Sequence, residues 1–339
     1  MFRRRRTPQT PIFTMGAADS RRRRRARRLA LTGGLAVALL VAAAALTAPE
    51  LGEPEAGPSV DRVASRERSV AVADVPPAAR FPADPALEAA RRYAQERDGE
   101  VSFAVVDSRG DLRGADADRS FASASLVKAM LLVAYLDQLE DDGLPIGTEG
   151  RALLDSMIRV SDNAAATQVY AAVGGAPALE GVAESAGMDD FAASPAWGES
   201  SITAADQARF FARIDRLVPR VHRDYALRLL SSIAPEQSWG IAQAAGDRFE
   251  PYFKGGWLPT AGGQLVHQAA LLERGGRRLS VAVLTDGSPS FDYGVQTVEG
   301  VAERILRPAE SSAGAAVSAA LGPRAAAADR AAATDRSAR

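Results

Sequence analysis

The spacing of apolar residues divides the middle of the chain into two kinds of segment. Between residues 126 and 241, apolar positions recur at three- to four-residue intervals, which is typical of amphipathic helices. On either side, runs rich in Val, Phe, Tyr and Leu end at Gly, Asp or Pro, which favours strands. The predicted helices are Leu87–Arg97, Leu126–Glu140, Arg151–Val160, Ala164–Val173, Ala178–Ala186, Ala204–Leu217, Arg223–Ile233 and Val295–Leu306. The predicted strands are Val101–Asp107, a second one after the turn at 108–111, Pro251–Trp257, Gln264–Glu273 and Leu279–Thr285.

This order of elements predicts an α+β fold. Strands at both ends of the segment enclose a long helical insert, which indicates an antiparallel sheet covered by helices plus an all-helical lobe. We expect residues 86–308 to form the folded domain. Residues 49–85 are rich in Pro, Ala and Glu and are predicted to be a linker, and the Ala-rich residues 309–339 are predicted to be a disordered tail.

The first 48 residues carry a targeting pattern. Residues 1–28 contain eleven arginines and one acid, and the uncharged run Leu29–Ala48 comes directly after them. Twenty apolar residues can span a bilayer as a helix, and a positive N-terminal flank directs the downstream part of the chain out of the cytoplasm. We therefore expect an extracytoplasmic protein, either secreted after cleavage of a signal peptide or anchored by residues 29–48.

Charge and composition exclude several classes of function. After residue 28 the chain has 30 basic and 41 acidic residues, a formal charge of −11, which disfavours nucleic acid as a partner. The chain has no cysteine, and its two histidines, His222 and His267, show no metal-ligand spacing. We expect no metal, no other cofactor and no disulfide.

The basic residues point to candidate chemistry. Only two of the 41 are lysine, Lys128 and Lys254, and lysine, unlike arginine, can lose its proton when it is buried. Lys128 lies one helical turn after Ser125, so the two side chains share a face. Ser161-Asp162-Asn163 lies between the lysines in sequence, and Lys254 opens Lys254-Gly255-Gly256. Together these segments suggest a serine enzyme that uses lysine as its base.

Each segment alone also has an ordinary structural explanation. Ser125 and Lys128 could be a helix cap and a solvated lysine, and Ser161 could begin the next helix. Lys254 could be a surface lysine at the end of a strand. It is the combination of the three segments, in this order, that favours the catalytic interpretation.

The motifs resemble those of the serine β-lactamase and penicillin-binding protein superfamily, and above all the class A β-lactamases. The resemblance spans residues 86–308 and includes Phe121, Met157-Ile158, Gly174-Gly175 and Gly187, which would close a helix. It implies a β-lactamase-like fold with the active site between the sheet and the helical lobe. It also implies that Ser125 is the acylated nucleophile, Lys128 its base, Ser161 a proton relay to the leaving nitrogen, and Lys254 a positive charge beside Ser161.

The resemblance further implies the residues that contact substrate. Asn163 would hold the side-chain amide of the substrate, and Gly256 and Trp257 would line the strand against which it lies. The backbone N–H groups of Ser125 and Trp257 would form the oxyanion hole. The implied substrate is a small molecule, either a β-lactam or a related D-amino-acid amide or ester.

Two departures from the family pattern affect turnover. Gly255 stands where the family usually has Thr or Ser, whose hydroxyl helps to bind the substrate carboxylate. The interval from Gly187 to Thr203 is about ten residues shorter than in class A enzymes and lacks their E-x-x-L-N segment. Glu199 is the one glutamate left there as a candidate for deacylation.

The leading hypothesis is therefore an exported, monomeric serine hydrolase that forms an acyl-enzyme at Ser125, with acylation better supported than deacylation. A D-alanyl peptidase or an esterase would use the same chemistry. The alternative is a catalytically weak or inactive cell-wall or β-lactam sensor with the same fold. A nucleic-acid-binding protein using the N-terminal arginines remains a third possibility. It would require residues 1–28 to stay attached in the cytoplasm.

Overall fold

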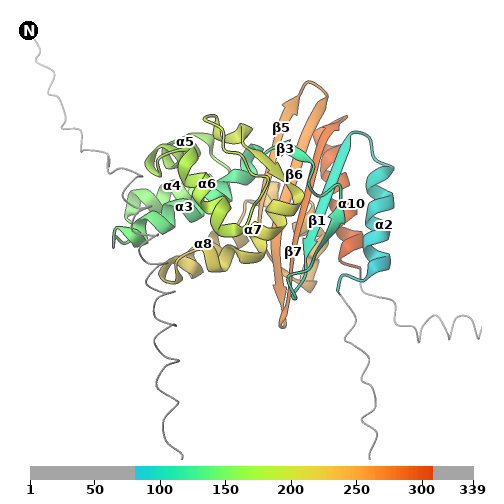
Figure 1. Ribbon diagram of the computed structural model, residues 1–339, viewed down its shortest axis with the longest axis horizontal. Coiled ribbons are helices and arrows are strands. Elements are labelled where there is room, and N and C mark those ends of the chain that lie inside the picture. The colour runs from blue at the N-terminus through green and yellow to red at the C-terminus, as the bar shows by residue number, and fades with distance from the viewer. Residues whose placement is uncertain (1–80, 308–339) are drawn as a thin grey trace, which may run out of the picture. The chain divides into compact units, whose positions relative to one another are not determined.

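The computed structural model describes residues 81–307, in which a five-stranded antiparallel sheet is packed between helices (Figure 1). The strand order is β2-β1-β7-β6-β5, and every neighbouring pair is antiparallel. The strands are β1 (Glu100–Val106), β2 (Leu112–Ala115), β5 (Glu250–Thr260), β6 (Gly263–Arg274) and β7 (Arg277–Ser288). The predicted α+β fold is confirmed.

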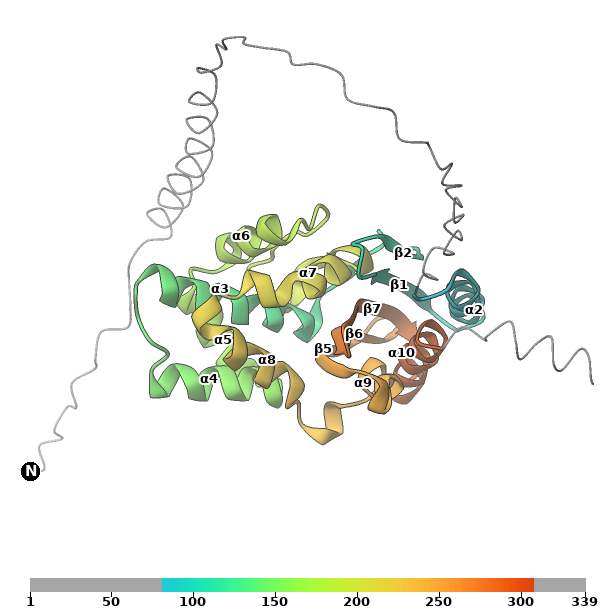
Figure 2. The ribbon, with the colours of Figure 1, turned by 90° about the horizontal axis from the view of Figure 1, so that it is seen from below.

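The helices form two groups around this sheet. The α-helices are α2 (Asp84–Gln95), α3 (Val127–Asp141), α4 (Thr148–Arg159), α5 (Asn163–Ala172), α6 (Ala176–Ala186), α7 (Ala204–Leu217), α8 (Arg223–Ser231), α9 (Ile241–Ala245) and α10 (Phe291–Ile305). Helices α2 and α10 cover one face of the sheet, and α7 covers the other face (Figures 1 and 2). Helices α3, α4, α5, α6 and α8 form the helical lobe, in which α8 also packs against β5.

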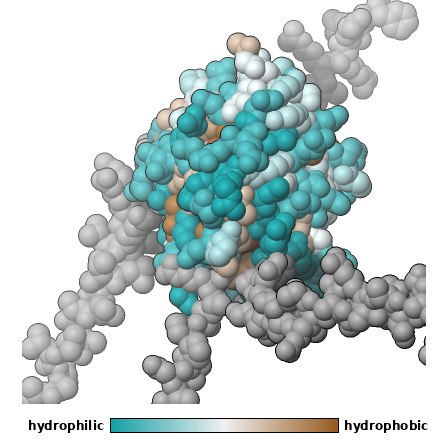
Figure 3. Space-filling view, turned by 90° about the vertical axis from the view of Figure 1, so that its right-hand side faces the viewer, coloured by the Kyte–Doolittle hydropathy of each residue, from teal (hydrophilic) through white to brown (hydrophobic). Residues whose placement is uncertain are grey.

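The pattern of burial results from these layers. The central strands β6 and β7 are covered on both faces, so their buried residues form near-continuous apolar runs rather than alternating ones. Helix α2 covers the sheet from one side only and buries Leu87, Ala90 and Ala94 along one stripe. Figure 3 shows the side of the domain that carries α2 and α10, and hydrophilic residues dominate its surface.

The predicted helix boundaries lie within four residues of those in the structure, and the short helix α9 was not predicted. Helix α7 has the predicted ends, and Gly187 closes α6 in the left-handed conformation expected of a C-terminal glycine. Helix α2 begins at Asp84, ahead of Pro85, and so starts within residues predicted to be linker. The predicted targeting segment 1–48, most of the linker and the tail 309–339 lie outside the described residues. Within 81–307, no helix is long and apolar enough to cross a membrane.

A small second sheet was not predicted and is important for the site. Strands β3 (Ser120–Ala122) and β4 (Ser201–Thr203) pair antiparallel, with Phe121 opposite Ile202. Three-residue strands carry too little periodicity to be read from sequence. This pairing joins the segment just before Ser125 to the end of the shortened loop.

His267 connects this small sheet to the large one. It is fully buried on β6, and its Nε2 lies 3.1 Å from the carbonyl oxygen of Ala122, while Nδ1 accepts a 3.1 Å hydrogen bond from Thr285 N. Nε2 therefore carries the ring proton and donates a hydrogen bond to the carbonyl oxygen of Ala122. Burial lowers the pKa of His267 to about 4, so the ring is neutral at physiological pH.

We expect this buried histidine to make stability depend on pH. The native pKa lies below the unfolded value of 6.5, so the unfolded chain binds more protons between these values, and stability falls as the pH drops below 6.5. Urea unfolding at pH 7 and pH 5 should differ by about 2 kcal/mol on account of His267. A His267→Gln variant should be less stable at pH 7 and should lose this part of the pH dependence. An unchanged dependence in that variant would contradict the assignment.

Candidate active site

Ser125 lies in a tight turn at the start of a buried helix. The 3-10 turn η1 (Ala124–Leu126) runs directly into α3, which places the side chain of Ser125 at the helix N-terminus. Ala124 has φ +44°, a left-handed conformation that is rare for a residue with a side chain. Ser125 is partly exposed, whereas Leu126 and Val127 beside it are buried. A reactive hydroxyl is thus presented at the surface of an otherwise closed core.

Strand β5 passes close beside this turn. A Cβ atom on Gly256 would lie 2.9 Å from the backbone nitrogen of Ser125 and 3.0 Å from that of Leu126. Any side chain at this position would displace the turn, so glycine is required by close approach. The strand segment after Lys254 is therefore held against the N–H groups beside Ser125.

Ser161 reaches the same region from the helical lobe. It lies between α4 and α5 with φ +60°, and Asp162 caps α5 by accepting a 2.7 Å hydrogen bond from Ala165 N. The strained backbone at Ser161 is held by helices on both sides. Its hydroxyl oxygen accepts from Lys128 Nζ at 3.1 Å and from Lys254 Nζ at 3.0 Å. One hydroxyl thus joins the two lysines of the chain.

Both lysines are fully buried. Lys128 Nζ also donates to the carbonyl oxygen of Ser161 at 2.5 Å and to Asn163 Oδ1 at 2.7 Å, and Lys254 Nζ donates to Gly255 O at 2.9 Å. Within residues 81–307, no carboxylate forms an ion pair with either ammonium group. The hydrogen-bond partners of both ammonium groups are therefore neutral oxygen atoms.

This environment changes the acidity of both groups. Burial lowers the pKa of Lys128 to about 8, and the more distant Asp162 charge opposes that shift. Burial and repulsion from Lys128 lower the pKa of Lys254 well below the ordinary lysine value. A neutral amine is consequently accessible near neutral pH, which an arginine at either position could not provide.

The structure brings most, but not all, of the predicted site residues into contact. Lys128, Ser161, Asn163 and Lys254 form one hydrogen-bonded group. Among the described residues, no hydrogen bond joins the Ser125 hydroxyl to Lys128 or Ser161. Asn163 is exposed, and its carboxamide oxygen faces Lys128, which leaves its N–H₂ group available to a ligand.

A tryptophan that the sequence pattern did not single out covers Lys128. The centroid of the Trp197 ring lies 5.1 Å from Lys128 Nζ, in the geometry of a cation–π contact. Trp197 opens the short turn η2 (Trp197–Glu199) in the shortened loop, whereas the predicted candidate Glu199 is exposed. The sequence feature that could have indicated Trp197 is an aromatic residue in a loop without the expected E-x-x-L-N segment. Sequence alone could not show which side chain of the loop reaches the lysine.

Gly255, which stands where the family usually has Thr or Ser, lies beside a tryptophan ring. A Cβ on Gly255 would lie 3.2 Å from Cζ2 of Trp239, so the indole occupies the space beside the glycine. Trp239, Trp257 and Phe291 form a cluster of edge-to-face rings with centroids 5.8–6.1 Å apart. This side of β5 is aromatic where the family pattern predicts a hydroxyl.

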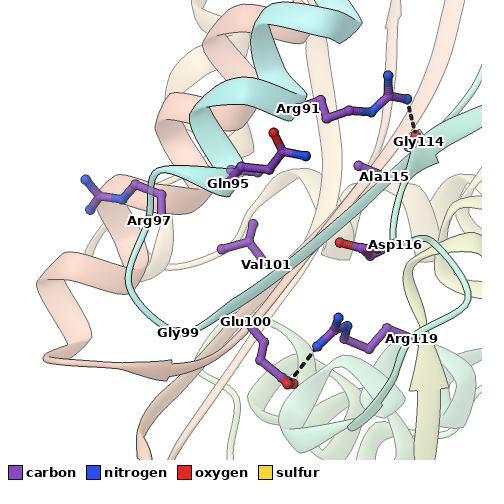
Figure 4. A pocket seen from close by; sticks show the side chains of 11 residues that line it. Arg91, Gln95, Arg97, Gly99, Glu100, Val101, Gly114, Ala115, Asp116 and Arg119 are labelled. Atoms are coloured by element: carbon purple, nitrogen blue, oxygen red, sulfur yellow. Dashed lines mark hydrogen bonds and ion pairs between the residues drawn. The ribbon is translucent and has the colours of Figure 1, made fainter.

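The rest of the described domain gives little support to other kinds of site. Within residues 81–307, no cluster of three or more His, Asp or Glu side chains is arranged to hold a metal ion. A cavity of about 420 Å³ lies between α2 and strands β1 and β2 (Figure 4). Its arginines already have partners: Arg119 pairs with Glu100, and Arg91 donates to Gly114 O. None of the predicted site residues lines this cavity.

Comparisons with known proteins agree with this geometry. Residues 144–308 match the family model of the beta-lactamase enzyme family, a segment that includes Ser161 and Lys254 but starts after Ser125 and Lys128. No match was found among curated proteins. Similar solved structures include PBP-A, with 16% identity over 68% of this chain and 97% of that chain and a TM-score of 0.59.

Solved β-lactamase structures give equally clear matches. A β-lactamase from Sphaerobacter thermophilus is 21% identical over 65% of this chain and 95% of its own, with a TM-score of 0.57. An ancestral class A β-lactamase is 18% identical over 65% and 98%, with a TM-score of 0.57. The predicted resemblance is confirmed in family model and in fold, and at these identities the structural matches show the fold alone.

The two lysines allow a direct test of the electrostatics. Protein labelled with ¹³C at lysine Cε should give two lysine resonances, which Lys128→Arg and Lys254→Arg variants would assign. We expect Lys128 to titrate near a pKa of about 8 and Lys254 to have a pKa below that of a solvated lysine, because both are buried. A midpoint for Lys128 at the ordinary value of 10.5 would show that the ammonium group is solvated.

Proposed function

We propose that this chain, whose residues 81–307 have the class A β-lactamase fold, is a serine hydrolase that forms an acyl-enzyme at Ser125. The substrates would be small molecules with a β-lactam ring or a related D-amino-acid amide or ester bond. The observation that carries the proposal is the contact of two fully buried lysines with one serine hydroxyl. Burying two lysines without a counter-charge costs desolvation free energy. For stability alone, a leucine or a solvated lysine at either position would avoid that cost, so the arrangement favours a catalytic role.

The proposed acylation uses each member of this group. Neutral Lys128 takes the proton of Ser125, whose Oγ bonds to the substrate carbonyl carbon. The N–H groups of Ser125 and Trp257 stabilise the resulting oxyanion. As the C–N bond breaks, the proton passes from Lys128 through the Ser161 hydroxyl to the leaving nitrogen, a path supported by the 3.1 Å Lys128–Ser161 contact.

The surrounding residues would bind the substrate. Lys254 supplies positive charge next to Ser161, and the free N–H₂ group of Asn163 suits the carbonyl oxygen of a substrate side-chain amide. Gly256 lets β5 approach the turn that carries Ser125, and Gly255 offers no hydroxyl to a substrate carboxylate. We therefore propose weaker binding of the carboxylate than in enzymes with Thr or Ser at this position.

Deacylation is the slower step in this proposal. Hydrolysis of the acyl ester needs a water held and deprotonated beside Ser125. Among the described residues no carboxylate pairs with Lys128, and Glu199 of the nearby loop is exposed. The acyl-enzyme should therefore persist.

The lack of a carboxylate paired with Lys128 among the described residues also favours a second function. In this function the domain is a sensor whose output is the acylated or ligand-bound state. A sensor has no need for turnover, and a persistent adduct would serve as its signal. A peptidase or esterase, by contrast, would have to release its product on the time scale of catalysis.

We also propose that the domain acts outside the cytoplasm, on the basis of Arg-rich residues 1–28 and the adjoining run Leu29–Ala48. A reporter that is active only after export, fused to the C-terminus of the full chain, should be active in a bacterial host. The same fusion without residues 1–48 should be inactive. Equal activity of the two fusions would contradict the proposed targeting role.

Acylation can be tested by intact-mass spectrometry of the purified protein with a penicillin over time. We expect one adduct with the mass of the intact penicillin, because opening a β-lactam ring releases no atoms. The adduct should be absent in Ser125→Ala. In Lys128→Arg it should form about 100-fold or more slowly, since arginine keeps its proton. The rate in the wild type should rise with pH through about 8, as Lys128 becomes neutral.

The lifetime of the adduct distinguishes the two candidate functions. An adduct that decays within seconds would favour a hydrolase, and one that lasts for hours would favour a sensor. Adduct formation in Ser125→Ala would show that another residue is the nucleophile and would overturn the mechanism.

A further inference from the structure

The side of Lys128 that faces the shortened loop is closed by an aromatic ring. Its ammonium group has oxygen partners in Ser161 and Asn163, and the nitrogen lies over the Trp197 ring, 5.1 Å from the ring centroid. Lys128 has no exposed surface, although Ser125, one helical turn away, is partly exposed. Access of solvent to the serine therefore does not extend to the lysine.

Trp197 is held in place from two directions. Its carbonyl oxygen accepts hydrogen bonds from Ser123 Oγ at 3.2 Å and from Ser200 Oγ at 2.8 Å, which ties η2 to the turn of the nucleophile. Its indole Nε1 donates to Thr167 Oγ1 at 3.2 Å on α5. The Thr167 hydroxyl in turn donates to the carbonyl oxygen of Asn163 at 3.0 Å. The ring is thus fixed between the two segments that carry the reacting groups.

Hydrolysis of an acyl-enzyme would need water on this side. The water oxygen must bond to the acyl carbon, the bond from that carbon to Ser125 Oγ must break, and a water proton must reach Ser125 Oγ as the acid departs. Lys128 is the one buried base of the group that lies a single turn from Ser125. On the side of Lys128 that faces the shortened loop, the Trp197 ring occupies the space where such a water would lie.

We propose that Trp197 is a positioning residue that keeps water away from Lys128, and that it thereby determines how long an acyl group remains on Ser125. This inference rests on the proposed acylation of Ser125. The Trp197 ring would then speed acylation and slow hydrolysis of the acyl-enzyme. A dry Lys128 is more readily neutral, which favours acylation, and it has no water to activate, which slows hydrolysis.

The first test does not depend on catalysis. In protein labelled with ¹³C at lysine Cε, Trp197→Ala should raise the pKa of Lys128 from about 8 toward 10.5, because water reaches the ammonium group. Trp239→Ala is the matched control, since it also truncates a half-buried tryptophan but one that packs beside Gly255 rather than over Lys128. An unchanged Lys128 titration in folded Trp197→Ala would overturn the proposal. A circular-dichroism melt establishes folding, and Trp197→Leu replaces the alanine variant if that variant does not fold.

The second test monitors the penicillin adduct by intact mass. Trp197→Ala should slow acylation at pH 7 by about tenfold, as a higher pKa leaves less neutral lysine. It should nevertheless shorten the lifetime of the adduct, because admitting water beside Lys128 outweighs the smaller fraction of neutral lysine. Trp197→Phe keeps a ring over Lys128 and should stay near the wild type in both rates. Loss of packing alone would slow acylation without shortening the lifetime, and that outcome would overturn the proposal.

The two tests separate failure of the inference from failure of the proposed function. If the wild type forms no adduct but Trp197→Ala raises the pKa of Lys128, the acylation proposal fails and water exclusion by Trp197 stands. If the wild type forms an adduct and Trp197→Ala changes neither the titration nor the lifetime, acylation stands and the role of Trp197 is wrong.

Discussion

The site depends on the burial of two ammonium groups around one hydroxyl. A buried charge is normally paired with an opposite charge, because desolvation otherwise costs several kcal/mol. Lys128 and Lys254 instead meet at Ser161 and repel each other, and both respond with lowered pKa values. The packing of the rest of the domain must therefore offset the free-energy cost of this arrangement.

Three separate segments hold the lysine pair. The helix α3 supplies Lys128, the strand β5 supplies Lys254, and the connection between α4 and α5 supplies Ser161. Two of the three positive φ values at non-glycine residues in the described chain, those of Ala124 and Ser161, fall in or beside these segments. Strain at such positions persists only where surrounding structure over-determines the backbone, as the helices and the small sheet β3–β4 do here.

Exclusion of water from the site favours acylation over deacylation in the proposed mechanism. Burial makes a lysine a usable base for attack by serine, but the same burial keeps away the water that would complete hydrolysis. The shortened loop places Trp197 at this point, and Glu199, which a family-based prediction would favour for deacylation, is exposed instead. One tryptophan therefore connects the length of a loop to the expected lifetime of a covalent intermediate.

The sequence by itself determined the types of the longer elements and, to within a few residues, the helix ends, because local periodicity and a C-terminal glycine such as Gly187 are properties of neighbouring residues. It also singled out Ser125, Lys128, Ser161 and Lys254, because arginine dominates elsewhere and these residue types carry specific chemistry. It could not locate the pairing of β3 with β4, the contact of Gly256 with the nucleophile turn, or the ring of Trp197 over Lys128. Those contacts join residues that are tens to more than a hundred positions apart, and one sequence contains no record of distance between them. Only the packing of the sheet against the helical lobe decided which side chains reach the lysines, and therefore whether water does.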